Sequence, residues 1–251
     1  MIANQLPSNN RLTLTQQSNL IPITAALYDK WRVRSLSLLT GEKYTLEREF
    51  ALMLDWLEAK PEQNFLDVGT STGNYAMVLA KKGARVTAID ISTPMLRRAQ
   101  ARIQSELAAA QAAAITLEQA NAEALPYADS SFEGVVLGGT LNEFNSTRAG
   151  LLECARVLKP GGRIFMMYLS QSEIRWARAI QFLFEIGQIR FPNRENVRST
   201  LQEAGLERTR AELRRAVTIE LFVKPGVERA NRAASNLAQP RPLARPIGKP
   251  Q

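Results

Sequence analysis

Short apolar runs alternate with amphipathic stretches through the middle of this 251-residue chain. The apolar runs predict strands at Phe65–Gly69, Arg85–Asp90, Ile115–Ala120, Phe132–Leu137 and Arg163–Leu169. Between them, apolar positions at helical spacing predict helices at Tyr75–Lys82, Pro94–Gln104 and Thr147–Val157. Such alternation is typical of a doubly wound, mostly parallel sheet with helices on both faces.

The flanking segments follow other patterns. Before the first strand we expect a helix over residues 23–40 and another that begins at the N-cap Thr45. After the fifth strand, Glu173–Gly187 predicts an amphipathic helix whose narrow polar stripe interrupts a wide apolar surface. A helix at Asn193–Ala204 and two further strands, Leu206–Arg214 and Ala216–Lys224, complete the pattern. The fold class is therefore α/β, with a seven-stranded sheet that ends in an antiparallel edge hairpin.

Four segments follow from these patterns. Residues 1–20 are polar and predict a flexible leader, and residues 21–60 form an N-terminal helical lid. Residues 61–225 form the α/β domain. Residues 226–251, with four prolines, five basic residues and one acidic residue, predict a disordered basic tail.

The net charge of +8 would suit a protein that binds nucleic acid or a membrane surface. About half of that excess lies in the tail, however, so the body of the domain is close to neutral. The chain has no histidine and one cysteine, Cys154, so His-based catalytic triads, His metal sites and internal disulfides are excluded, and no metal is expected. We expect Cys154 to be a buried structural thiol.

No apolar run reaches the length of a membrane span, and the first twenty residues lack the pattern of a signal peptide. We therefore expect a cytoplasmic protein.

The first predicted strand runs into a loop of small residues, Gly69 to Gly73, before a helix opens at about Asn74. Glycine and serine leave room for a ligand to approach the backbone, and the helix N-terminus offers unpaired N–H groups. The second strand ends in Asp90, 21 residues after Gly69, where a carboxylate can accept hydrogen bonds from both ribose hydroxyls. The alternative role for Asp90 is helix capping, but its neighbour Ser92 can also cap.

Two cofactor classes compete for this loop: a nicotinamide or flavin dinucleotide, and S-adenosylmethionine. The dinucleotide fingerprint requires a small sixth residue, and Asn74 occupies that position. Glycine at the first and fifth positions, with a small residue at the third, is the spacing found in methyltransferases.

Residues 65–165 resemble the class I (Rossmann-like) S-adenosylmethionine-dependent methyltransferases, especially the branch of quinone, sterol and phospholipid methyltransferases. Four segments carry the resemblance in order: FLDVGTSTGNYA (65–76), VTAIDISTPMLRRAQAR (86–102), ANAEALPYADSSFEGVV (120–136) and ECARVLKPGGRIF (153–165). Together they are specific for the fold and cofactor and leave the acceptor open.

The resemblance implies a role for each motif residue toward S-adenosylmethionine. Backbone contacts would come from Gly69 and Ser71, with Asp67 ordering the loop and Gly73 allowing the turn into the helix. Asp90 would hold the ribose hydroxyls. Ile91 and Met95 would pack on the adenine. Asn121 and Ala122 would bind the edge of the adenine. Leu137 and Gly138 would lie beneath the sulfonium.

Two positions depart from the family pattern. Ser71 stands where glycine is commoner, which is tolerable if its φ is negative. Asn121 stands where aspartate is usual; its amide oxygen can still accept a hydrogen bond from adenine, but as a weaker, neutral acceptor.

The acceptor side is less well marked. Glu143, in the stretch after the fourth strand, is the first candidate to position or deprotonate an acceptor; the alternative is a solvated or capping residue. Tyr28, in the predicted lid, is the second, and core packing is its alternative. The same stretch lacks the Asn/Asp-Pro-Pro-aromatic signature of base and amide methylation, which disfavours nucleic-acid targets.

We therefore expect methyl transfer to a small, lipophilic acceptor such as a quinone or isoprenoid precursor. The apolar surface of the Glu173–Gly187 helix suits such an acceptor, and its arginines could meet anionic lipids in a peripheral membrane contact, although a core-packed lid helix is the alternative. Two rival functions remain open: an RNA- or protein-modifying enzyme guided by the basic tail, and a non-catalytic S-adenosylmethionine-binding subunit. The oligomeric state is left open.

Overall fold

A computed structural model describes residues 32, 34–37, 39–40, 43, 45–186 and 189–226. The predicted leader, Tyr28 and all but the first residue of the predicted tail lie outside the described residues. Of the predicted helix over residues 23–40, the described positions from 32 to 40 are helical.

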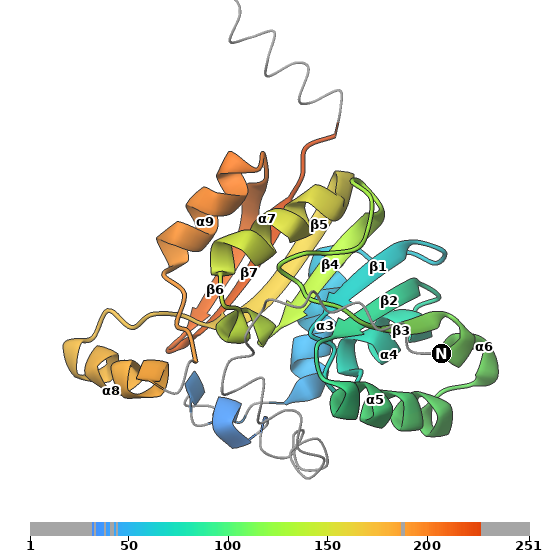
Figure 1. Cartoon of the computed structure of the whole chain (residues 1–251), viewed down its shortest axis with the longest axis horizontal. Coiled ribbons are helices and arrows are strands. Elements are labelled where there is room, and N and C mark those ends of the chain that lie inside the picture. The colour runs from blue at the N-terminus through green and yellow to red at the C-terminus, as the bar shows by residue number, and fades with distance from the viewer. Residues whose placement is uncertain are drawn as a thin grey trace, which may run out of the picture.

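The sheet has seven strands in the order β3-β2-β1-β4-β5-β7-β6, which confirms the predicted fold class (Figure 1). The strands are β1 (Asn64–Val68), β2 (Arg85–Asp90), β3 (Ile115–Gln119), β4 (Phe132–Gly138), β5 (Leu158–Leu169), β6 (Glu207–Arg214) and β7 (Val217–Val223). The first five run parallel, and β7 pairs antiparallel with both β5 and β6. The predicted edge hairpin is therefore present.

From Leu46 onward, the described residues form seven α-helices and one short 3₁₀ helix. They are α3 (Leu46–Leu57), α4 (Asn74–Lys81), α5 (Thr93–Glu106), α6 (Ala109–Ala113), η1 (Thr140–Glu143), α7 (Thr147–Val157), α8 (Arg175–Ile186) and α9 (Arg194–Glu203). Several start where the sequence places a cap: the side chains of Thr45, Ser92 and Asn193 accept hydrogen bonds from first-turn N–H groups.

Two apolar layers hold the helices against the sheet. On one face, α3 and α4 pack around Phe165, whose ring meets those of Trp56 and Tyr75 edge-on at 5.9 and 6.3 Å. On the other face, α7 and α9 cover β4, β5 and β7, and Cys154 is buried there as predicted, with its pKa raised to about 12 by burial. Figure 1 shows α7 and α9 on the opposite side of the sheet from α3.

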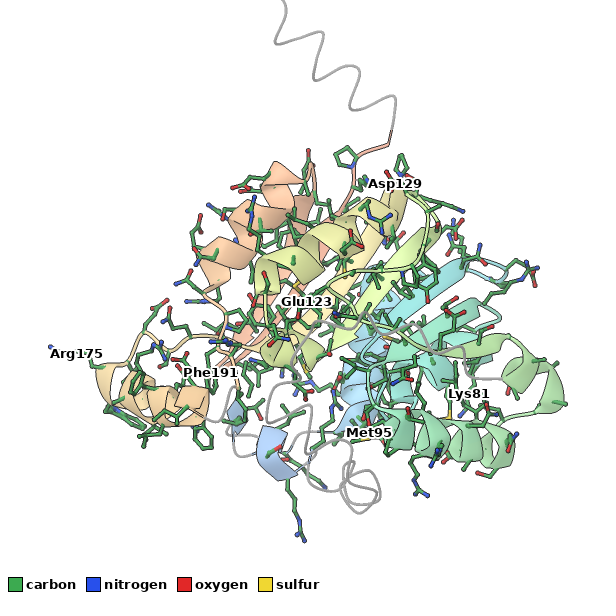
Figure 2. All side chains as sticks on the ribbon, in the orientation of Figure 1. Lys81, Met95, Glu123, Asp129, Arg175 and Phe191 are labelled. Atoms are coloured by element: carbon green, nitrogen blue, oxygen red, sulfur yellow. The ribbon has the colours of Figure 1, made fainter. Side chains whose placement is uncertain are left out.

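The two ends of the sheet are distinct. Asp129, just before β4, marks the amino end of the parallel strands, and Met95, just after β2, marks the carboxyl end (Figure 2). In open α/β sheets the ligand site lies outside the carboxyl ends.

The packing of α3 and α8 differs from the simplest expectation for each helix. The predicted lid helix α3 packs on the sheet face, and none of its residues lines the site described below. The alternative of a core-packed α8 with a solvated polar stripe is wrong, because its one buried residue is the polar Gln181. The sheet beneath is already covered by α3, α4, α7 and α9, so no apolar face remains for α8.

Candidate functional site

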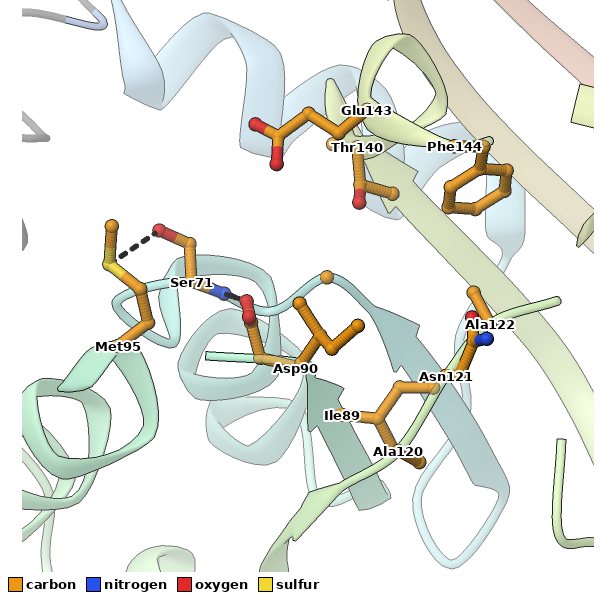
Figure 3. A pocket seen from close by; sticks show the side chains of 13 residues that line it. Ser71, Ile89, Asp90, Met95, Ala120, Asn121, Ala122, Thr140, Glu143 and Phe144 are labelled. Carbon is orange, nitrogen blue, oxygen red and sulfur yellow. Dashed lines mark hydrogen bonds between the residues drawn. The ribbon is translucent and has the colours of Figure 1, made fainter. Parts of the chain in front are cut away.

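A cleft of about 590 Å³, open to solvent, lies at the carboxyl ends of β1, β2 and β4. Figure 3 shows Asp90, Ile89 and Asn121 on one wall and Thr140, Glu143 and Phe144 on the facing wall. The lining residues are Gly69, Ser71, Ile89, Asp90, Ile91, Met95, Ala120, Asn121, Ala122, Gly138, Thr140, Glu143 and Phe144.

Gly69 and Ser71, in the loop from Gly69 to Gly73, line the cleft after β1. Three alternate residues of this loop have left-handed backbones: Gly69 with φ of +67°, Ser71 with +50° and Gly73 with +84°. The expected negative φ at Ser71 is therefore not observed, because every second residue of this loop has a positive φ. A Cβ atom on Gly69 would lie 2.1 Å from Thr140 Oγ1, so this position requires glycine for space as well as for φ.

Asp67 ties this loop to the helix that follows. Its Oδ2 atom accepts hydrogen bonds from the Thr70 hydroxyl at 2.7 Å and from the Ala76 N–H at 3.1 Å. The carboxyl is buried, and desolvation raises its pKa to about 7 against the opposing effect of these two bonds. Asp67 itself does not line the cleft, so its contribution to the site is to order the loop.

Asp90 reaches the same loop from the tip of β2. Its Oδ2 atom accepts from the Ser71 N–H and its Oδ1 atom from the Ser92 N–H, both at 2.8 Å. Desolvation raises the pKa of Asp90 to about 6, although both hydrogen bonds favour the ionised form. Each carboxylate oxygen keeps a lone pair, so this half-buried group can accept further hydrogen bonds from a ligand.

Asn121 and Ala122 follow β3 and lie beside Ile89 along the same wall. The amide oxygen of Asn121 accepts a 2.9 Å hydrogen bond from the Glu123 N–H, which closes a local turn. The predicted adenine acceptor is therefore already engaged, and a ligand would share its second lone pair.

The end of β4 contributes Gly138, and not Leu137, to the cleft. The side chain of Leu137 is fully buried in the layer under α7. Successive residues of a strand point to opposite faces, so Gly138 faces the layer that contains Tyr75. A Cβ atom on Gly138 would lie 2.2 Å from the Tyr75 ring, so the strand end and α4 are in direct contact.

Comparisons with known proteins decide which of the two cofactor classes this site serves. Residues 66–166 match a family model described as a methyltransferase domain. The ubiquinone/menaquinone biosynthesis C-methyltransferase UbiE of Paracoccus denitrificans is 30% identical over 183 residues, which cover 62% of this chain and 71% of that protein. The chain belongs to the class I S-adenosylmethionine-dependent methyltransferases. It falls in the branch that contains the quinone methyltransferases, and its cofactor is S-adenosylmethionine.

Two further relatives carry other methyltransferase names. The O-methyltransferase resE of Aspergillus sclerotiorum is 38% identical over 109 residues, or 43% of this chain and 40% of that protein. The demethylmenaquinone methyltransferase of Desulfitobacterium hafniense is 26% identical over 180 residues, or 61% of this chain and 70% of that protein.

Solved structures share the fold of this methyltransferase at low identity. The [4+2]-cyclase SpnF is 17% identical with a TM-score of 0.64, covering 84% of this chain and 97% of that one. A methyltransferase of Aquifex aeolicus is 19% identical with a TM-score of 0.53, covering 70% of this chain and 89% of that one.

The residues of the cleft fit the cofactor of this methyltransferase family. A carboxylate for vicinal hydroxyls, an amide beside an apolar wall, and a loop without room for a Cβ at Gly69 match a nucleoside joined to an amino acid. Of the predicted cofactor residues, Asp67, Gly73 and Leu137 do not line the cleft.

The predicted acceptor residues have different outcomes. Glu143 lines the cleft at the end of η1, and Figure 3 shows its carboxylate extending from that wall toward the Ser71 end. Tyr28 lies outside the described residues. Thr140 and Phe144 also line the cleft and were not singled out, although both belong to the stretch after the fourth strand that drew attention to Glu143. Their proximity to a strand tip was the only sequence signal for them.

Among the described residues, no helix combines the length and apolar character that crossing a membrane requires.

Proposed function

We propose that this methyltransferase transfers a methyl group to a small, lipophilic acceptor of the quinone or isoprenoid-precursor type. The names of the UbiE relatives supply the acceptor class. One observation carries the assignment to this cleft: Glu143 and Phe144 line the same cleft as Asp90. A polar group and an aromatic ring thus stand opposite the wall that suits a nucleoside.

Each wall has its own task in this proposal. Asp90 accepts hydrogen bonds from the ribose hydroxyls, and Asn121 and Ala122 face the adenine edge. Ile91 and Met95 pack on the adenine, while the backbones of Gly69 and Ser71 border the amino-acid part. The glycine at 138 leaves room beneath the reacting atoms.

S-adenosylmethionine supplies a methyl group on a positively charged sulfur, which an acceptor attacks in line. The protein's main contribution is therefore to align the acceptor and to exclude water. Glu143 orients the acceptor hydroxyl or accepts its proton, and Phe144 provides an apolar contact for a ring.

A label-transfer experiment tests this function. Full-length protein is incubated with methyl-labelled S-adenosylmethionine and a panel of quinone and isoprenoid-phenol precursors dispersed in detergent. We expect label in the organic extract, and a loss of at least about tenfold in kcat for Glu143→Gln with unchanged S-adenosylhomocysteine affinity.

Glu203→Gln is the matched control, because Glu203 lies on α9 in an exposed ion pair with Arg148. Label that enters only RNA or protein would overturn the proposal in favour of a macromolecular target. Cofactor binding without transfer to any acceptor would favour a non-catalytic subunit.

A further inference from the structure

Helix α8 is docked to the protein by its polar side. Gln181 is its one buried residue; its Nε2 atom donates to the Ser170 carbonyl at 2.9 Å, and its Oε1 atom accepts from the Ser172 N–H at 2.8 Å. Arg178 and Glu185, seven residues apart on the same side of α8, form an ion pair at 3.0 Å. The part of the predicted polar stripe formed by Arg178, Gln181 and Glu185 is therefore bonded within the protein.

The opposite side of α8 is apolar and exposed to solvent. We define the outward face of α8 as Trp176, Ala179, Ile180, Phe182, Leu183 and Ile186. Trp176 is 69% exposed, Leu183 64% and Ile186 67%. Every large hydrophobic residue that is exposed in the described part of the chain lies between Ile174 and Ile186, with the exception of Leu213. Single exposed apolar residues are ordinary, but a contiguous set on one helix marks an interaction surface.

The charges around this face favour an anionic partner. Both acidic residues of the segment are neutralised within the protein, Glu185 by Arg178 and Glu173 by Arg194. Arg175 and Arg190 are exposed and form no ion pair with any described residue. Figure 2 shows Arg175 at the outer end of α8, pointing away from the body. A second copy of the chain would present the same cations, whereas an anionic lipid surface presents the opposite charge.

The segment that carries α8 is fastened to the cleft at both ends by Asn142. The Nδ2 atom of this buried residue donates to the carbonyls of Leu169 and Arg190, and its Oδ1 atom accepts from the Leu169 N–H at 2.9 Å. Asn142 immediately precedes Glu143, which lines the cleft. A surface that holds α8 therefore lies near the edge of the sheet where the cleft opens.

We propose that the outward face of α8 docks on the surface of an anionic phospholipid bilayer. The apolar side chains enter the boundary between headgroups and acyl chains, and Arg175 and Arg190 lie at headgroup level. The proposal deepens the proposed function and rests in part on it, since a lipophilic acceptor is concentrated in that bilayer. The docking itself is measurable without any acceptor.

Vesicle co-sedimentation of the full chain tests the docking. Vesicles of phosphatidylcholine alone are compared with vesicles that also contain phosphatidylglycerol. We expect the wild type to sediment with the mixed vesicles and its tryptophan emission to shift to the blue. The double variant W176S/L183S should lose at least about tenfold in partitioning, because two large apolar side chains no longer enter the bilayer.

Two charge-reversal variants distinguish electrostatic docking from nonspecific adsorption. Arg175→Glu should weaken binding to the mixed vesicles about fivefold or more. Lys82→Glu makes the same change of charge at an exposed position that follows α4, at the amino end of β2, and should leave binding unchanged. Melting temperature and S-adenosylhomocysteine calorimetry for each variant establish that the fold is intact.

Three results would overturn the proposal. One is a wild type that binds neither kind of vesicle, or a W176S/L183S variant that binds as well as the wild type. Another is a dimer in sedimentation velocity that W176S/L183S dissociates, which would assign the face to a second copy. The third is vesicle binding that requires removal of residues 1–31, which would assign the face to the chain's own N-terminal segment. Methylation of acceptors in detergent does not depend on docking, so failure of the proposed function is scored separately.

Discussion

The backbone N–H of Ser71 donates a 2.8 Å hydrogen bond to the carboxylate of Asp90. This contact joins the loop after β1 to the tip of β2, two segments 19 residues apart in sequence. It exists because β1 and β2 are adjacent and parallel, with Val68 opposite Ile89. The two motifs that define the cofactor cleft are thus in direct contact before any ligand binds.

Removal of the Asp90 carboxylate tests its proposed role toward the ribose. Asp90→Ala should weaken S-adenosylhomocysteine binding by about 1–3 kcal/mol, because an ionised acceptor for two hydroxyls is lost. Isothermal calorimetry measures the change. Asp129→Ala, a surface carboxylate before β4, is the control and should bind as the wild type does. Equal affinities for wild type and Asp90→Ala would remove Asp90 from the site.

The pH dependence of cofactor binding should follow the same carboxyl. The pKa of Asp90 is raised to about 6, so the free protein takes up a proton there as the pH falls, and a protonated carboxyl is a poorer acceptor. Affinity should be constant at alkaline pH and fall by up to about tenfold per unit below pH 6. Calorimetric titrations at intervals of about one pH unit, from about pH 5 to about pH 8, measure this change in affinity.

Asp67, with a pKa raised to about 7, titrates in a neighbouring range. Asp67→Asn keeps an acceptor and removes that titration, so its profile should retain only the step near pH 6. A flat profile in the wild type would contradict the assignment to Asp90.

Gly69 tests whether space or backbone conformation constrains the loop. Gly69→Ala meets both obstacles, a φ of +67° and the side chain of Thr140 at 2.1 Å. Gly161→Ala meets only the first, since its φ is +82° and its Cβ would lie in open space. We expect Gly161→Ala to cost about 1 kcal/mol of unfolding free energy and Gly69→Ala about 2 kcal/mol more, with loss of cofactor binding. Denaturant unfolding measures both.

The left-handed backbone of Ser71 makes an opposite prediction. Ser71→Gly should raise stability by about 0.5–1 kcal/mol, because glycine adopts a φ of +50° without steric cost. Binding should persist, since the bond to Asp90 comes from the backbone N–H. The reverse change at Gly73, Gly73→Ser, should destabilise the protein. A destabilised Ser71→Gly would show that the hydroxyl contributes more than the strain costs.

Asn142 should be essential for holding α8 in place. Asn142→Ala leaves the buried polar groups of Leu169 and Arg190 without their partner and should cost about 2–4 kcal/mol. Limited proteolysis should then cut faster between residues 171 and 190. Asn145→Ala, an exposed asparagine three residues later, should change neither stability nor cleavage.

The amino-acid sequence by itself determined the sheet, its helices and the position of the cofactor loop. Apolar runs of strand length and glycines at Gly69 and Gly73 are local signals, and parallel strand order then brings Asp90 to the same edge. For the same reason Glu143 could be expected at the cleft, since it follows a strand tip.

Tertiary packing alone decided the rest. The pleat of β4 sends Leu137 into the layer under α7 and turns Gly138 toward Tyr75 of α4. Ser71 adopts a positive φ because the loop must close on Asp90. The orientation of α8 is the clearest case: periodicity shows that a helix has a polar and an apolar side, but not which side meets the protein. Here α3, α4, α7 and α9 already cover the sheet, and the bonds of Gln181 turn the apolar side outward.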